Sequence, residues 1–106
     1  MTDELYIIAE AGVNHNGSLQ TALKLIEAAC DAGADCIKFQ AFSAEELVIK
    51  KEEAQYEMLS KLELSEDDFR KIAFRCGNRP LDFLVTPFSP KWVRILCDIG
   101  VKGFKI

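Results

Sequence analysis

The chain has 106 residues, of which 49% are hydrophobic and 28% are charged, and its formal net charge at pH 7 is -4. The length fits one small domain, and the hydrophobic content excludes an intrinsically disordered chain. The mild acidity provides no basic surface for nucleic acid or for an anionic membrane. The first four residues lack the basic flank of a signal peptide, and charged residues interrupt each apolar run before the roughly 18 residues of a membrane helix. We therefore expect a soluble, cytoplasmic α/β protein with no nucleic-acid or membrane partner.

Apolar strands alternate with amphipathic helices along the whole chain. Residues 5–9 form a nearly continuous apolar run, typical of a parallel strand covered on both faces, and Glu10 is expected to end this strand. Further strands are expected at 36–40, 81–86 and 103–106. Helices are expected at 18–32, 43–50, 53–62, 66–76 and 90–99, with serines 18, 65 and 89 as N-caps and glycines 33, 77 and 100 at the C-terminal ends. This repeated βα unit predicts a parallel sheet with right-handed crossovers.

The four cysteines, Cys30, Cys36, Cys76 and Cys97, lie within apolar segments and form no CxxC pair. This spacing indicates neither a metal site nor a disulfide framework. We expect buried, reduced thiols, as in cytosolic proteins.

Polar side chains stand near the carboxyl end of every predicted strand. Ligands of parallel α/β folds bind beyond these ends, in open sheets and in closed barrels. Two of these side chains are lysines inside apolar strands, where an ammonium group is costly unless it is paired or binds an anion. In chain order the set is Glu10, Lys38, Gln40, Thr86 and Lys105.

This set predicts a cleft in which two cations and a hydroxyl hold a phosphate or a carboxylate, while one carboxylate transfers a proton. The alternative is that each lysine extends to solvent at the rim of the sheet and binds nothing. His15, the only histidine, lies in the turn after the first strand, where it is either a solvated or capping residue or a substrate contact. Asn14 and Gly17 suit the geometry of the same turn. The spacing indicates an anion site without identifying a substrate.

Several segments resemble the N-acetylneuraminate (sialic acid) synthase family, in the same order along the chain. The first is Ile-Ile-Ala-Glu-Ala-Gly-Val-Asn-His-Asn-Gly-Ser at 7–18, and Ala-Gly-Ala-Asp at 32–35 leads to Lys-Phe-Gln at 38–40. Further matches are Gln-Tyr-Glu-Met-Leu at 55–59, Leu-Glu-Leu-Ser at 62–65, Thr-Pro-Phe at 86–88 and Phe-Lys-Ile at 104–106. The resemblance spans about residues 5–106. The family includes legionaminate and pseudaminate synthases and spore-coat polysaccharide proteins, and the legionaminate and sialate branches are the more similar ones.

The resemblance implies the N-terminal half of a (β/α)8 TIM barrel, with four parallel strands and their covering helices, so that residues 1–106 are a partial synthase domain. It also implies a transferase of carbohydrate biosynthesis, acting toward lipopolysaccharide, capsule or spore coat polysaccharide. Such an enzyme joins phosphoenolpyruvate to an N-acetylated hexosamine in its aldehyde form and releases phosphate.

Site residues follow from the resemblance position by position. Glu10 matches an essential acidic residue, for which we expect proton transfer or orientation of a water molecule. The candidate substrate-binding residues are Lys38, Thr86 and Lys105 for the phosphate and carboxylate of phosphoenolpyruvate, together with Gln40, Asn14 and His15.

Some family features have no counterpart in these residues. The family uses manganese or magnesium to polarise the aldehyde and is expected to form a homodimer, but its metal-binding histidines and its C-terminal antifreeze-like domain follow the segment matched here. A complete barrel needs about 250 residues. We therefore expect an N-terminal fragment without metal ligands that does not turn over alone. The stretch between Val48 and Gln55 is shorter than usual, and Ala41 and Val85 replace a threonine and a serine that are common in the family.

Two alternatives stay open. The chain could be a non-catalytic, anion-binding or self-associating fragment, because its first and last strands would be open sheet edges. It could also belong to another phosphate-binding barrel enzyme, such as a related phosphoenolpyruvate aldolase-type synthase. The motif at 10–17 argues against this second alternative.

Overall fold

The structure, a computed structural model, describes residues 5–47 and 52–105. One parallel sheet contains, in spatial order, the strands β1 (Ile8–Gly12), β2 (Cys36–Ala41), β3 (Asp82–Pro87) and β4 (Gly103–Phe104). The helices are α1 (Leu19–Asp31), α2 (Ala44–Leu47), α3 (Glu53–Ser60), α4 (Glu66–Gly77) and α5 (Pro90–Ile99). The predicted parallel α/β architecture is confirmed. No helix in the described part of the chain has the length and apolar character needed to cross a bilayer.

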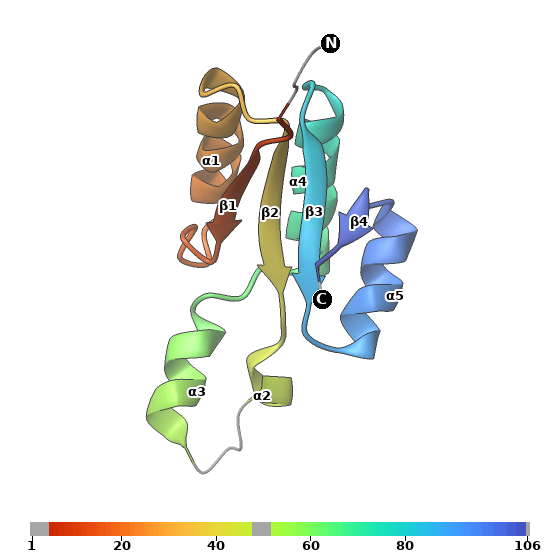
Figure 1. Ribbon diagram of the computed structural model, residues 1–106. Coiled ribbons are helices and arrows are strands. Elements are labelled where there is room, and N and C mark those ends of the chain that lie inside the picture. The colour runs from red at the N-terminus through yellow and green to blue at the C-terminus, as the bar shows by residue number, and fades with distance from the viewer. Residues whose placement is uncertain (1–4, 48–51, 106) are drawn as a thin grey trace.

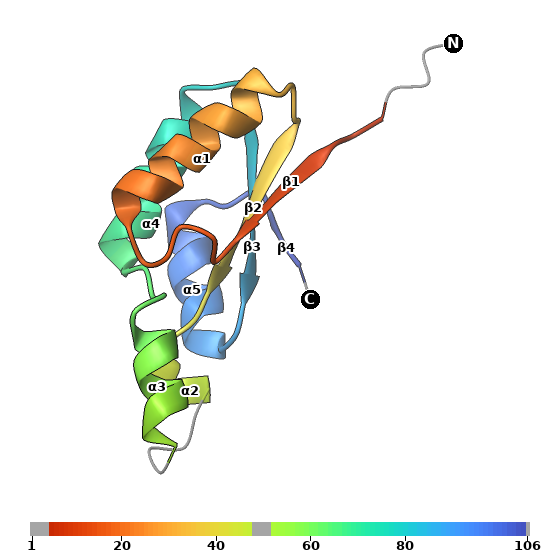
Figure 2. The ribbon, with the colours of Figure 1, turned by 90° about the vertical axis from the view of Figure 1, so that its left-hand side faces the viewer.

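All three long helices cover the same face of the sheet. Figure 1 shows α1, α4 and α5 behind the strands, and Figure 2 shows the opposite face bare of any described element, with α2 and α3 beyond the carboxyl end of β2. The core lies between the sheet and these helices. In it Phe39 and Phe83 meet edge to face at 6.0 Å between ring centroids, and Phe69 and Trp92 do so at 5.4 Å.

Side chains of β2 and β3 alternate between these two faces, whereas β1 interrupts the alternation between Glu10 and Gly12. In β2, Ile37, Phe39 and Ala41 are buried under the helices, whereas Lys38 and Gln40 are half-buried. Because side chains alternate along a strand, Lys38 and Gln40 belong to the uncovered face, which we call the bare face. The expectation that the first strand is covered on both faces is wrong for the described residues, since Ile8 is 45% exposed.

Strand β1 lies three residues later than predicted. The amides of Asp35 and Cys36 donate to the carbonyl oxygen of Ile7 at 2.8 and 3.1 Å, and the amide of Ile7 donates to the Asp35 carboxylate at 2.7 Å. Pairing therefore begins where β2 begins, and β1 continues to Gly12. Glu10 consequently lies inside the strand and does not end it.

The helix ends follow the local signals closely. The hydroxyls of Ser18, Ser65 and Ser89 accept hydrogen bonds from the backbone amides of their first turns, which confirms all three N-caps. Helix α4 includes Gly77, one residue beyond the predicted end. Helix α2 is described over Ala44–Leu47, and residues 48–51, which include the rest of the helix predicted at 43–50 and part of the shortened stretch, lie outside the described residues.

An ion-pair cluster joins α1 to α4. The Glu27 carboxylate accepts from Arg75 at 3.0 Å and from Arg79 at 2.7 Å. These guanidinium groups, Arg79 foremost, lower the pKa of Glu27 below its usual value. The cluster connects two helices that are far apart in sequence.

The cysteines are only partly as predicted. All four are free, and Cys36 and Cys76 are buried. Burial raises the pKa of the Cys76 thiol to about 12, so this thiol stays protonated. The predicted burial is wrong for Cys97, which lies on the outer, exposed side of α5.

Candidate functional site

Glu10 and Lys38 form an ion pair on the bare face. They are direct neighbours in the β1–β2 register, and the Lys38 Nζ lies 2.8 Å from the Glu10 Oε1. The Lys38 side chain is 17% exposed, whereas that of Glu10, on the edge strand, is 53% exposed. A half-buried ammonium is thus held beside a carboxylate that solvent or a ligand can reach.

The next row of the sheet carries the other predicted residues. Gln40 pairs with Thr86 in the β2–β3 register. The Lys105 amide donates to the carbonyl oxygen of Val85 at 2.9 Å, which continues the β3–β4 ladder and places Lys105 beside Thr86. Thr86 therefore lies in β3, between β2, which carries Lys38, and β4, which leads to Lys105.

Gly12 also contributes to this site, although it is not among the residues predicted from the sequence. The register slips between Glu10 and Gly12, and Gly12 is buried with a φ of +54°. A Cβ atom at Gly12 would lie 3.5 Å from the Glu10 Oε2 and 3.8 Å from the Gln40 Nε2. The carboxylate and the amide thus converge on a position without a side chain. The signal was present as the glycine two residues after Glu10 in the first motif.

Asn14 and His15 do not join this row. Asn14 is exposed in the turn after β1, where its amide donates to the carbonyl oxygen of Ala11. His15 is 0% exposed, and its ring lies 6.1 Å from that of Phe39, which is buried in the core. Burial lowers the pKa of His15, and the nearby Asp68 carboxylate opposes this shift. The solvated alternative for His15 is wrong.

No metal centre is formed by the part of the chain that the structure describes. It contains no group of three or more His, Cys, Asp or Glu side chains that could hold an ion. The described residues therefore do not fit a manganese or magnesium site.

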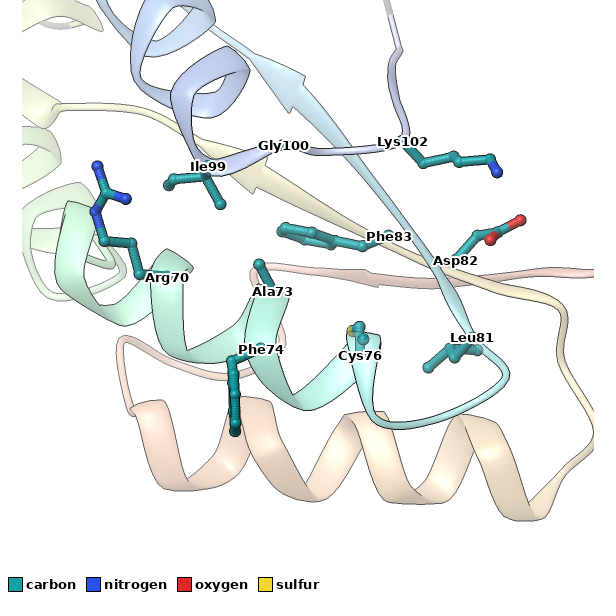
Figure 3. Close-up of a pocket in the computed structure, with 11 residues that line it drawn as sticks. Arg70, Ala73, Phe74, Cys76, Leu81, Asp82, Phe83, Ile99, Gly100 and Lys102 are labelled. Carbon is teal, nitrogen blue, oxygen red and sulfur yellow. The ribbon is translucent and has the colours of Figure 1, made fainter.

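A separate cavity of about 450 Å³ opens between α4, α5 and the amino ends of β3 and β4. Figure 3 shows Phe74, Phe83 and Ile99 around it, with Arg70 and Lys102 on either side. It includes none of the residues predicted for the site, and it lies on the helix side of the sheet.

The bare face carries the Lys38 ammonium, the Glu10 carboxylate, the Gln40 amide and the Thr86 hydroxyl, and the backbone of Lys105 continues the same row. Helices on one face and polar residues on the other define a segment of a parallel β/α barrel, in which the bare face is the interior. Residues 25–106 match the NeuB family, and the chain belongs to this family.

Two curated relatives are named as synthases of N,N'-diacetyllegionaminic acid. The chain is 43% identical to the N,N'-diacetyllegionaminic acid synthase of Legionella pneumophila, across 95% of this chain and 32% of that protein. It is 42% identical to the synthase of the same name from Campylobacter jejuni, across 94% of this chain and 34% of that protein. The chain thus spans about a third of the length of the curated relatives it matches.

Solved structures agree with this assignment. The N-acetylneuraminic acid synthetase of Leptospira borgpetersenii, solved in complex with citrate, matches with a TM-score of 0.90 and 36% identity over 98% of this chain and 36% of its own. The spore coat polysaccharide biosynthesis protein SpsE of Bacillus subtilis matches with a TM-score of 0.76 and 33% identity over 99% of this chain and 30% of its own. The expected fold, an N-terminal portion of a TIM-barrel synthase domain, and the family resemblance are confirmed.

Proposed function

We propose that this chain supplies the phosphoenolpyruvate-binding part of a nonulosonate synthase, with residues 1–106 as a partial barrel domain. The observation that carries the proposal is the row on the bare face, in which the Lys38–Glu10 ion pair adjoins Gln40, Thr86 and Lys105. Phosphoenolpyruvate carries a phosphate and a carboxylate, and each is an acceptor for charge-assisted hydrogen bonds.

Each residue has a role in this proposal. Lys38 and Lys105 hold the two anionic groups, and the Thr86 hydroxyl donates between them. Charge-assisted hydrogen bonds of this kind are roughly twice as strong as neutral ones. Gln40 orients the ligand through its amide beside Gly12.

The reaction proposed for the whole synthase forms one carbon–carbon bond. The methylene carbon of phosphoenolpyruvate attacks the aldehyde carbon of an N-acetylated hexosamine, water adds at the former enol carbon, and inorganic phosphate leaves. Glu10 is exposed enough to meet the attacking water, and its carboxylate accepts or orients one of the water protons. We further propose that any manganese or magnesium ion is held by residues other than those described here, and that the whole enzyme is a cytoplasmic homodimer.

Support for anion binding comes from the relatives. The Leptospira protein was solved in complex with citrate, which is a polycarboxylate. The relatives' names include synthases of N,N'-diacetyllegionaminic acid, pseudaminic acid and N-acetylneuraminate 9-phosphate, and each of these named products is an acidic sugar.

The proposal is tested by titrating phosphoenolpyruvate into the 106-residue chain and measuring the heat of binding. Lys38→Ala is expected to weaken binding by about 2 kcal/mol, or roughly 30-fold, the scale of a hydrogen bond to a charged group. Lys24→Ala is the matched control, because Lys24 is an exposed lysine on α1, in the helix layer. No binding by the wild-type chain, or an equal loss in both variants, would contradict the proposal and leave Lys38 only as the partner of Glu10 in the ion pair.

A further inference from the structure

His15 lies beneath the bare face and not on it. Its neighbour Phe39 is fully buried between Lys38 and Gln40 in β2 and points to the helices, opposite to these two residues. The His15 imidazole packs on this buried ring with 0% exposure. A substrate on the bare face is therefore separated from His15 by the sheet.

The two ring nitrogens of His15 differ in their surroundings. The Nδ1 accepts a hydrogen bond from the Gly17 amide at 2.9 Å, so it carries no proton in this arrangement. The neutral ring then carries its proton on Nε2, which is buried and has no hydrogen-bond partner among the described residues. Of the two ring nitrogens, Nδ1 is therefore the one that makes a hydrogen bond within the turn.

The turn that His15 closes is packed tightly on a distant segment. Gly17 has a φ of +76°, and a Cβ atom there would lie only 1.9 Å from the Lys61 carbonyl oxygen, in the connection from α3 to α4. Asn16 also has a positive φ, of 54°. Asn and Gly tolerate this left-handed backbone, and the hydrogen bond from the Gly17 amide to the His15 Nδ1 closes the turn from inside.

The same turn begins at Gly12, where Glu10 and Gln40 converge. The amide of Asn14 donates to Ala11, and the amide of Ser18 donates to His15, so a series of backbone bonds runs from the end of β1 to the start of α1. The turn is thus continuous with the site, since a Cβ atom at Gly12 would lie 3.5 Å from the Oε2 of Glu10, whose Oε1 pairs with Lys38.

We propose that His15 is a positioning residue, whose Nδ1 fixes the turn 12–17 and thereby sets the Glu10–Lys38–Gln40 geometry. This inference rests on the proposed function in one respect, because the residues whose geometry is fixed are those of the proposed phosphoenolpyruvate site.

Two variants with amide side chains distinguish the roles of the two ring nitrogens of His15. In His15→Asn, the side-chain oxygen replaces Nδ1 as the acceptor for the Gly17 amide, and in His15→Gln the longer amide replaces Nε2. Two quantities are measured in the 106-residue chain by NMR: hydrogen exchange of the Gly17 amide without ligand, and phosphoenolpyruvate affinity.

We expect His15→Gln to speed exchange of the Gly17 amide about tenfold and to weaken phosphoenolpyruvate about tenfold, as for the loss of one hydrogen bond. We expect His15→Asn to restore both values to within about twofold of the wild type. The opposite ranking, with His15→Gln retaining binding and His15→Asn losing it, would make His15 a direct substrate contact through Nε2 and overturn the proposal.

The wild-type chain gives a second measurement that needs no variant. The 15N spectrum of the His15 ring should show a protonated Nε2 and a hydrogen-bonded, unprotonated Nδ1, and a proton on Nδ1 would overturn the proposal. If the wild type does not bind phosphoenolpyruvate, the proposed function fails, while Gly17 exchange and the ring spectrum still decide the role of His15.

Discussion

The Glu10 carboxylate is paired with the Lys38 ammonium group, to which an anionic ligand would also bind. At 2.8 Å from Lys38, it both holds the lysine side chain in place and competes with a phosphate for it. Glu10→Gln should therefore strengthen the binding of inorganic phosphate to the chain about fivefold, which corresponds to the roughly 1 kcal/mol of an exposed ion pair. Calorimetry with inorganic phosphate measures this change.

The matched control for this variant is Glu45→Gln, which removes the same charge from an exposed position in α2. It should leave the phosphate affinity unchanged. Weaker phosphate binding by Glu10→Gln would show that the carboxylate positions Lys38 more than it competes for it.

Gly17 is the residue at which backbone conformation and packing act together. Ala at this position would meet the Lys61 carbonyl oxygen at 1.9 Å as well as adopt a positive φ. Gly33 has a similar φ of +82° but no atom within 4 Å of its Cβ position. Gly33→Ala therefore measures the cost of the positive φ alone, without a steric clash. We expect Gly33→Ala to lower the free energy of unfolding by about 1 kcal/mol and Gly17→Ala by more than about 3 kcal/mol.

Urea unfolding of both glycine variants provides the comparison. Equal losses of unfolding free energy in the two variants would mean that the turn shifts away from Lys61 without an energetic cost. That result would also remove the steric part of the argument for a fixed turn at 12–17.

At the scale of elements, α4 depends on a reciprocal cap. The Ser65 hydroxyl accepts from the Asp68 amide at 3.0 Å, and the Asp68 carboxylate accepts from the Ser65 amide at 3.0 Å. Ser65→Ala removes the first of these bonds and should lower the free energy of unfolding by about 1 kcal/mol in urea. Ser60→Ala, at the end of α3, is the control and should be neutral, and a loss of stability as large as that of Ser65→Ala would contradict the role of the cap.

Helix ends were predictable from the sequence because their signals are local. Ser65 with an acid three residues later, or Ser89 before Pro90, specifies a cap whatever packs on the helix. The limits of β1 were not predictable in this way, because they depend on where β2 begins and on the bonds of Ile7 to Asp35 and Cys36.

In the candidate site, too, some features could be predicted from local sequence and others could not. Alternation along the strands brings Lys38, Gln40 and Thr86 to one face, and this could be inferred from apolar runs alone. The burial of His15 involves Phe39, and the turn that holds His15 packs at Gly17 on the α3–α4 connection at Lys61; both partners are remote in sequence. No local pattern at 12–17 distinguishes a histidine below the sheet from one above it.

At the scale of the whole molecule, the sheet lacks a second layer in the described residues. Both outer strands pair on one side only, and Ile8 in β1 is exposed together with Leu5, Tyr6 and Ile7, which precede the strand. A parallel sheet with one bare face and open edges is a template for pairing with further strands. This observation favours the alternative in which the 106-residue chain self-associates.

We therefore expect the sedimentation coefficient of the 106-residue chain to rise with concentration. Ile8→Lys places a charge on the bare face beside the open edge and should weaken association about tenfold or more, which is at least about 1.4 kcal/mol. Met58→Lys is the matched control, because Met58 is 56% exposed but lies on α3, away from the sheet. If sedimentation velocity shows a monomer at all concentrations, or if both lysine variants dissociate the chain equally, the open edge of β1 is not the surface through which copies of the chain meet.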